Sequence, residues 1–190
     1  MAKLKLGVIV GSNRRESINR KLANALAGLG GDRFESRFIR IDDLPMYNQD
    51  HEQPVPETVA RFKAEVEVSD ALLFVTPEHS RSIPALLKNA IDWGARPWGK
   101  TSWPGKPAVV TGTSGGAIST AVAQQHLRAV LGDQGLHLMG GEAYIQFRPD
   151  LIDAEGTIVD DSVRGFLKAF VDRFAAFAAR LVPDRKQAAA

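Results

Sequence analysis

The feature that most constrains this chain is a regular alternation of short aliphatic runs with longer segments of helical apolar spacing. Leu4-Lys-Leu-Gly-Val-Ile-Val10 is a run of the first kind, and it ends at Gly11-Ser12 as a buried strand ends in a turn. From Ile18 to Leu29 the apolar residues recur at helical intervals, and Gly30-Gly31 follows as a C-cap would. Strands that alternate with helices predict a parallel sheet covered by helices on both faces.

The same alternation continues to the end of the chain. We expect further strands within residues 34–41, 71–76, 106–111 and 137–147, and a last helix over about 162–181. Ser82 and Pro84 suit an N-cap and an early helical proline after the third strand. The aromatic residues of the last helix predict a core-facing stripe, namely Phe166, Phe170, Phe174 and Phe177. The fold class is therefore α/β, a doubly wound sheet of five parallel strands in the order 2-1-3-4-5. We expect one domain over residues 1–182 and a disordered tail over 183–190.

Composition excludes several classes of function. The 190 residues include no cysteine, which excludes disulfides, iron–sulfur clusters, thiolate zinc sites and a cysteine nucleophile, so redox chemistry requires a cofactor. The 24 Lys and Arg residues nearly balance 22 Asp and Glu, and we expect no nucleic-acid partner. No apolar run approaches the ~18 residues of a membrane span, and none reads as a signal peptide, so we expect a cytoplasmic protein without a membrane partner. The four histidines show neither metal nor triad spacing, and we assign no metal ligand.

Three polar loops follow the first, third and fourth predicted strands, over residues 11–19, 77–82 and 111–117. In such a sheet, ligands bind beyond the carboxyl ends of the strands, where the strand order reverses. The first loop leads into a helix N-terminus, where free N–H groups and the helix dipole favour an anion. Ser12, Ser17 and Asn19 add hydroxyl and amide groups, and Arg14 adds a forked cation suited to phosphate. The alternative is that Ser17 only caps the helix and the arginines are solvated.

The motifs that are missing narrow the phosphate ligand. The chain has no Gly-x-x-x-x-Gly-Lys-Ser/Thr and no Gly-x-Gly-x-x-Gly after its first strand, which disfavours a P-loop nucleotidase and a dinucleotide fold. Gly11-Ser12 stands where a receiver domain would carry an acidic pair. A hydroxyl-rich loop suits a single terminal phosphate, and a flavodoxin-like arrangement with FMN at the switch point is the leading interpretation. The second loop would then lie beside the flavin ring, and the small residues of the third would let the backbone approach it.

Three stretches of this sequence resemble one family. Gly11-Ser-Asn-Arg-Arg-Glu-Ser-Ile-Asn19, the run from Pro77-Glu-His-Ser-Arg-Ser to Leu-Lys-Asn-Ala-Ile-Asp-Trp93, and Gln125-His-Leu-Arg128 resemble the NADPH-dependent FMN reductases. That group includes bacterial chromate and quinone reductases and azoreductases. The resemblance implies homodimers or homotetramers in which neighbouring subunits help to form the flavin site. The family usually has Tyr-Asn after Pro-Glu, whereas this chain has His79-Ser80, and we expect this difference to bear on the redox potential and the substrate preference.

The resemblance also implies which residues bind the cofactor. The first loop would hold the FMN phosphate, the second would contact the isoalloxazine ring, and the third would border it. The candidate cofactor-binding residues are Ser12, Arg14, Ser17, Ile18, Asn19, Pro77, Glu78, His79, Ser80, Arg81, Ser114, Gly115 and Gly116.

The function we predict is hydride transfer from NADPH or NADH to bound FMN, and then reduction of a small-molecule electron acceptor of the quinone, azo, flavin or chromate type. The flavin carries the chemistry, so we assign no catalytic side chain. Arg14, Arg15 and Arg81 are candidates for favouring NADPH over NADH. One alternative is an FMN-binding electron carrier without nicotinamide reductase activity, although such carriers tend to be strongly acidic and this chain has a net charge of +2. A second alternative is a flavin-free fold that uses the pocket for regulation.

Overall fold

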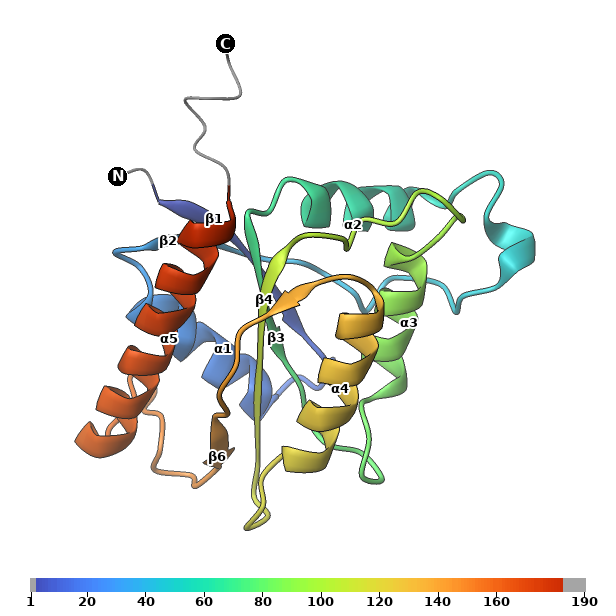
Figure 1. The fold of residues 1–190 in the computed structure, drawn as a ribbon. Helices are drawn as coiled ribbons and strands as arrows, with labels where there is room; N and C mark the ends of the chain where they lie inside the picture. Colours follow the sequence, from blue (N-terminus) through green and yellow to red (C-terminus); the bar gives the residue numbers. More distant parts are fainter. Residues whose placement is uncertain (1–2, 183–190) are drawn as a thin grey trace.

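The computed structural model describes residues 3–182, which form one twisted parallel sheet between two layers of helices (Figure 1). The strand order β2-β1-β3-β4-β5 confirms the predicted doubly wound topology. Every strand pair in the sheet is parallel. The strands are β1 (Leu4–Val10), β2 (Phe34–Phe38), β3 (Ala71–Val75), β4 (Pro107–Ser114), β5 (His137–Leu138) and β6 (Tyr144–Gln146).

The helices divide between the two faces of the sheet. One face is covered by α1 (Ile18–Leu29) and α5 (Asp161–Leu181). The other is covered by α2 (Glu57–Glu67), α3 (Ala85–Gly94) and α4 (Ala121–Asp133), and a short 3-10 helix, η1 (Gln49–His51), precedes α2. All five residues of β3 are buried, because apolar side chains on both of its faces meet helices. The core is therefore two apolar layers separated by the sheet.

The predicted fifth strand is in fact two short strands that both pair with β4. β5 pairs with the start of β4, and β6 pairs with its end. Between them the chain turns at Gly141, whose φ of +88° suits glycine. Arg128 holds this connection by donating to the carbonyl oxygens of Met139 at 2.9 Å and of Gly141 at 2.6 Å. The strand is interrupted because the chain leaves the edge of β4 at the glycines and returns further along it.

Two local predictions were wrong. Helix α3 begins at Ala85 with Pro84 at its N-cap and no side-chain cap, so Ser82 does not cap it. Ser82 instead closes a turn with His79. On α5, Phe170 and Phe174 are buried as predicted, whereas Phe166 is 44% exposed, because Val163 and Leu167 occupy the core-facing side of the helix at this turn. The predicted tail over residues 183–190 lies outside the described residues.

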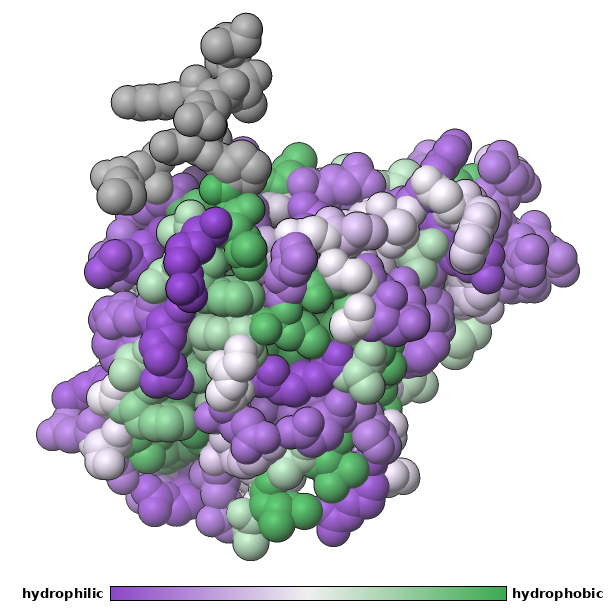
Figure 2. Space-filling model, viewed as in Figure 1, coloured by the Kyte–Doolittle hydropathy of each residue, from purple (hydrophilic) through white to green (hydrophobic). Residues whose placement is uncertain are grey.

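The face of the molecule in Figure 2 is mainly hydrophilic. Apolar surface lies between α4 and α5, over the edge of β4, and again around the loop that follows β4 at the lower end of this view. Within residues 3–182, no helix is both long and apolar enough to cross a bilayer.

Candidate functional site

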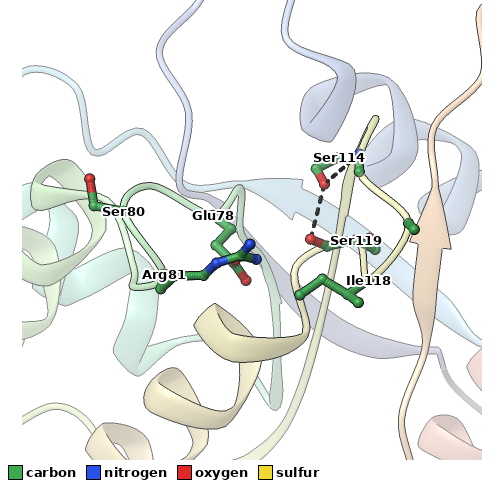
Figure 3. A pocket seen from close by; sticks show the side chains of 8 residues that line it. Glu78, Ser80, Arg81, Ser114, Ile118 and Ser119 are labelled. Carbon is green, nitrogen blue, oxygen red and sulfur yellow. Dashed lines mark hydrogen bonds and ion pairs between the residues drawn. The ribbon is translucent and has the colours of Figure 1, made fainter.

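The loops that follow β1, β3 and β4 end at one edge of the sheet. Val10 pairs in register with Val75, and Val75 pairs with Thr111, so the three strands finish side by side. A cleft of about 510 Å³ opens between the loop after β3 and the loop after β4 (Figure 3). Its lining residues are Glu78, Ser80, Arg81, Ser114, Gly116, Ala117, Ile118 and Ser119.

The loop after β1 leads into the N-terminus of α1. Ser17 is 4% exposed, and its hydroxyl accepts a hydrogen bond from the backbone N–H of Arg20 at 3.1 Å, so it caps the helix. The other N–H groups of the first turn have no partner within the helix, as at any helix start. Arg14 and Arg15 are exposed, and Ser12 is half-buried. This loop therefore combines free backbone donors with a hydroxyl and two exposed cations.

Asn19 ties α1 to β4. Its side-chain Nδ2 donates to the carbonyl oxygen of Thr113 at 2.9 Å, and its Oδ1 accepts from the Thr113 N–H at 2.9 Å. Strand β3 ends its pairing opposite Thr111, two residues earlier, so no strand reaches Thr113 on that side. The buried Asn19 amide takes the place of the missing strand. Its side chain fixes the position of α1, and what it offers toward the loop is its backbone N–H.

The loop after β3 closes in a two-residue hairpin turn. His79 and Ser82 exchange backbone hydrogen bonds of 3.0 and 2.9 Å. The central residues Ser80 and Arg81 have φ values of +50° and +60°, which is the type I′ geometry that usually requires Gly or Asn. Outside the turn, the Ser82 hydroxyl lies 3.2 Å from Nδ1 of His126 on α4. The turn presents Ser80 and Arg81 to the cleft.

Glu78 connects the second loop to the helix that follows the third. Its Oε2 accepts from the N–H of Ala123 in the first turn of α4 at 3.0 Å. Its Oε1 accepts from Nη1 of Arg81 at 2.9 Å, and the carboxylate side chain is only 7% exposed. Glu78 therefore bonds both within its own loop, to Arg81, and to a residue 45 positions away along the chain. No local pattern signals that contact, since it depends on how α4 packs.

The loop after β4 is held by its own serines. Ser114 Oγ donates to the carbonyl oxygen of Ser119 at 3.0 Å and accepts from the N–H of Gly116 at 3.3 Å. Ser119 Oγ donates to the carbonyl oxygen of Ile145 on β6 at 2.7 Å. The loop is thus pinned at both ends, and Gly115 to Ile118 are exposed between the pins.

The predicted site residues fall into two groups. Those that line the cleft are Glu78, Ser80, Arg81, Ser114 and Gly116. Those at the same edge of the sheet but outside the lining are Ser12, Arg14, Ser17, Ile18, Asn19, Pro77, His79 and Gly115. Sequence reasoning missed Ala117, Ile118 and Ser119, although their place next to Gly115-Gly116 in a switch-point loop was a usable signal.

A doubly wound sheet in this order, with a polar cleft at its switch point, defines a flavodoxin-like protein. The family model for NADPH-dependent FMN reductase matches residues 4–150. A 2-hydroxy-1,4-benzoquinone reductase of Burkholderia sp is 47% identical over 96% of this chain and 98% of its own length. A quinone reductase of Pseudomonas putida is 46% identical over 90% of this chain and 93% of its own.

A solved structure of a flavoenzyme is also similar to this chain. FerB of Paracoccus denitrificans, described as a flavoenzyme NAD(P)H:(acceptor) oxidoreductase, superposes with a TM-score of 0.91 at 44% identity, covering 94% of this chain and 98% of its own. The chain belongs to the NADPH-dependent FMN reductase family. It is an oxidoreductase that uses NAD(P)H and FMN, which confirms the predicted cofactors and favours the enzyme over the electron carrier.

Proposed function

We propose that this enzyme reduces quinones with NAD(P)H, through FMN held at the carboxyl ends of β1, β3 and β4. The observation that carries the proposal is the cleft between two pinned loops at the switch point of the sheet. Relatives named as quinone reductases that align over nearly the whole chain support quinones as the acceptor class.

The donor set of the first loop fits the FMN phosphate. The start of α1 provides backbone N–H groups from Ile18 and Asn19, and the helix dipole favours a dianion there. Ser12 and Ser17 add hydroxyls, and Arg14 is exposed on the same loop, where it is free to swing onto a phosphate. No carboxylate other than that of Glu16 lies in residues 11–19, so the local charge is positive.

The second and third loops fit the flavin ring. The backbone of Pro77 to Arg81 would face one edge of the ring, and Ser114 to Gly116 would border it. A side chain added at Gly115 would meet no atom within 4 Å, and one at Gly116 only the Ser114 Oγ at 3.6 Å. The main chain is therefore bare on the side where a flat ring would approach.

When bound, FMN supplies the two-electron chemistry that links NAD(P)H oxidation to acceptor reduction. The residues of this chain hold and orient the reactants and limit the access of water to the ring. Glu78 keeps the two loops at a fixed separation by joining Arg81 to the start of α4. We assign no proton-transfer step to a side chain.

An absorbance scan of the purified protein, repeated anaerobically after addition of NADPH, tests the proposal. The expected result is a flavin spectrum that bleaches on reduction and recovers when 1,4-benzoquinone is added. A flavin spectrum that does not bleach would support the electron carrier. A protein that takes up no flavin after incubation with FMN would contradict the site assignment.

We extend the proposal to four finer properties. Residues 1–182 would form one domain, as the single sheet shared by both helix layers supports. The protein would form a homodimer or homotetramer, which light scattering on a sizing column checks. It would act in the cytoplasm, where NAD(P)H is available, which cell fractionation checks. Chromate would serve as a further acceptor, which chromate-dependent NADPH oxidation checks.

A further inference from the structure

The rim of the cleft is chemically unlike its floor. Glu78 and Ser119 are largely buried, and their polar atoms are bonded within the protein. Arg81 and Ile118 also line the cleft, but the Arg81 side chain is 68% exposed and Ile118 is 50% exposed. In Figure 3, Arg81 reaches into the cleft from the second loop, and Ile118 lies on the facing third loop. Ser80, Gly116 and Ala117 are also exposed at the cleft, but Arg81 and Ile118 carry the largest exposed side chains of its lining.

The exposed charge at this rim is positive, because the Arg81 side chain is largely exposed and the Glu78 side chain that pairs with it is buried. Glu78 is the one carboxylate among the lining residues and Arg81 the one cation. The Glu78 carboxylate is shared, since it accepts both from Arg81 and from the first turn of α4, where the helix dipole adds a partial positive charge. The two positive partners outweigh the single buried negative charge. The outward-facing part of the Arg81 guanidinium is therefore available to an anion.

Ile118 supplies the complementary apolar contact. It is a large apolar side chain that the loop holds out toward solvent, between residues pinned at Ser114 and Ser119. A planar ring that stacks in the cleft would cover it, and burying part of an isoleucine favours binding without regard to charge. A cation on one side and an aliphatic side chain on the other together suit a flat ring that carries an anionic oxygen.

We propose that Arg81 and Ile118 make this enzyme selective for acceptors that are flat rings with an anionic oxygen. An ionised 2-hydroxyquinone is the simplest acceptor of this kind. Such a quinone is a vinylogous acid and is an anion at neutral pH. This inference rests on the proposed quinone reductase function. Reduction consumes one hydride from NAD(P)H and two protons from water, which converts the hydroxyquinone anion into the neutral trihydroxybenzene and releases NAD(P)⁺. Arg81 binds the oxygen anion and takes no proton.

The test compares 2-hydroxy-1,4-benzoquinone with the uncharged 2-methoxy-1,4-benzoquinone. In the wild-type enzyme, the anion should have the higher kcat/KM and the lower dissociation constant on the oxidised holoenzyme, measured by calorimetry without NAD(P)H. Arg81→Asn should lower the preference for the anion about two- to fivefold, in line with a partly exposed ion pair. Asparagine tolerates the positive φ at this position, so the turn is retained. Arg81→Lys should keep most of the preference.

Ile118→Asp provides a second variant that leaves the Arg81–Glu78 pair intact. It should lower anion binding more than binding of the methoxy compound. Arg33→Asn, which removes an exposed arginine paired with Asp32 far from the cleft, is the control and should leave the preference as in the wild type. The inference would be overturned if the wild type, Arg81→Asn and Ile118→Asp all showed the same preference for the hydroxyquinone anion over the methoxyquinone.

The two proposals fail in different ways. An enzyme that oxidises NAD(P)H no faster when either quinone is present would contradict the quinone reductase function, whatever the binding measurements show. An enzyme that reduces both quinones equally well and binds them equally would keep that function and overturn the role of Arg81 and Ile118.

Discussion

Single residues at the switch point are constrained by their neighbours more than by their own propensities. Gly112 is the clearest case, because an added Cβ would lie 2.0 Å from the carbonyl oxygen of Thr76 and 2.6 Å from the Thr120 hydroxyl. Backbone on one side and a buried side chain on the other leave no room for adjustment. At this position the residue type is set by the close approach of β4 to the end of β3.

Gly112→Ala should therefore lower the free energy of unfolding by about 3 kcal/mol or more, as overpacking against backbone does. Urea denaturation followed by circular dichroism measures this. Gly132→Ala is the matched control, because a Cβ there meets nothing within 4 Å, and on helix α4 it should raise stability by about 0.5–1 kcal/mol. Equal effects of the two substitutions would refute the steric argument.

Arg15 is the residue for which we predict a role in nucleotide choice. It is exposed in the loop before α1, next to Arg14. Arg15→Ala should lower the ratio of kcat/KM for NADPH to that for NADH about five- to tenfold, since a guanidinium pairs with the extra phosphate. Arg37→Ala, on β2 away from the cleft, serves as the control. An unchanged ratio of kcat/KM for NADPH to that for NADH in Arg15→Ala would contradict this prediction.

The elements are joined by side chains that act where the strand pairing stops. Asn19 continues the hydrogen bonding of β4 beyond the end of β3, and Glu78 closes the start of α4. Asp160 caps the start of α5, since its Oδ1 accepts from the N–H groups of Ser162 and Val163. The helices of this fold are placed by such contacts as well as by apolar packing.

Asn19→Ala should lower the free energy of unfolding by about 2–4 kcal/mol, because it leaves the buried N–H and carbonyl of Thr113 without partners. Asn24→Ala, at an exposed position of the same helix, should change stability by less than about 0.5 kcal/mol. Thermal unfolding of the two variants side by side distinguishes them. A small effect of Asn19→Ala would mean that water replaces the amide.

The cap of α5 makes stability depend on pH at the acid end. Backbone hydrogen bonds, chiefly from Val163, lower the pKa of Asp160 below its usual 3.8, with a smaller contribution from Arg148. A carboxylate with a lowered pKa stabilises the folded state above about pH 3.8, and this contribution is lost as the pH falls through the lowered value. Asp160→Asn, which keeps a capping oxygen, should flatten that part of the profile. Unfolding free energies between pH 2 and 6 measure it, and identical profiles would contradict the assignment.

At the scale of the whole molecule, the cofactor and the fold should stabilise each other. The three switch-point loops come from separate parts of the chain, and a ligand that touches all three favours the folded state over the unfolded one. FMN bound as proposed would also bridge α1 and the α4 side of the sheet, next to the contacts that Asn19 and Glu78 make at this edge.

FMN at about 100 times its dissociation constant should add about 2.7 kcal/mol and raise the Tm by roughly 5–10 °C. Riboflavin at the same concentration should raise it less, because riboflavin lacks the phosphate that the first loop is proposed to bind. Calorimetry with both flavins on protein stripped of flavin makes the comparison. Equal shifts would show that the first loop does not hold a phosphate.

The sequence by itself determined the order of the elements, the parallel doubly wound sheet and the three loops at its switch point. These follow from local periodicity and from Gly, Ser and Pro at the ends of the strands, which act over a few residues. The tertiary structure alone decided the contact of Glu78 with α4, the clamp of Asn19 on Thr113, the split of the fifth strand and the place of Ile118 on the rim of the cleft. The contacts of Glu78 and Asn19 span 45 and 94 residues, so they form only once packed helices and paired strands have brought those segments together.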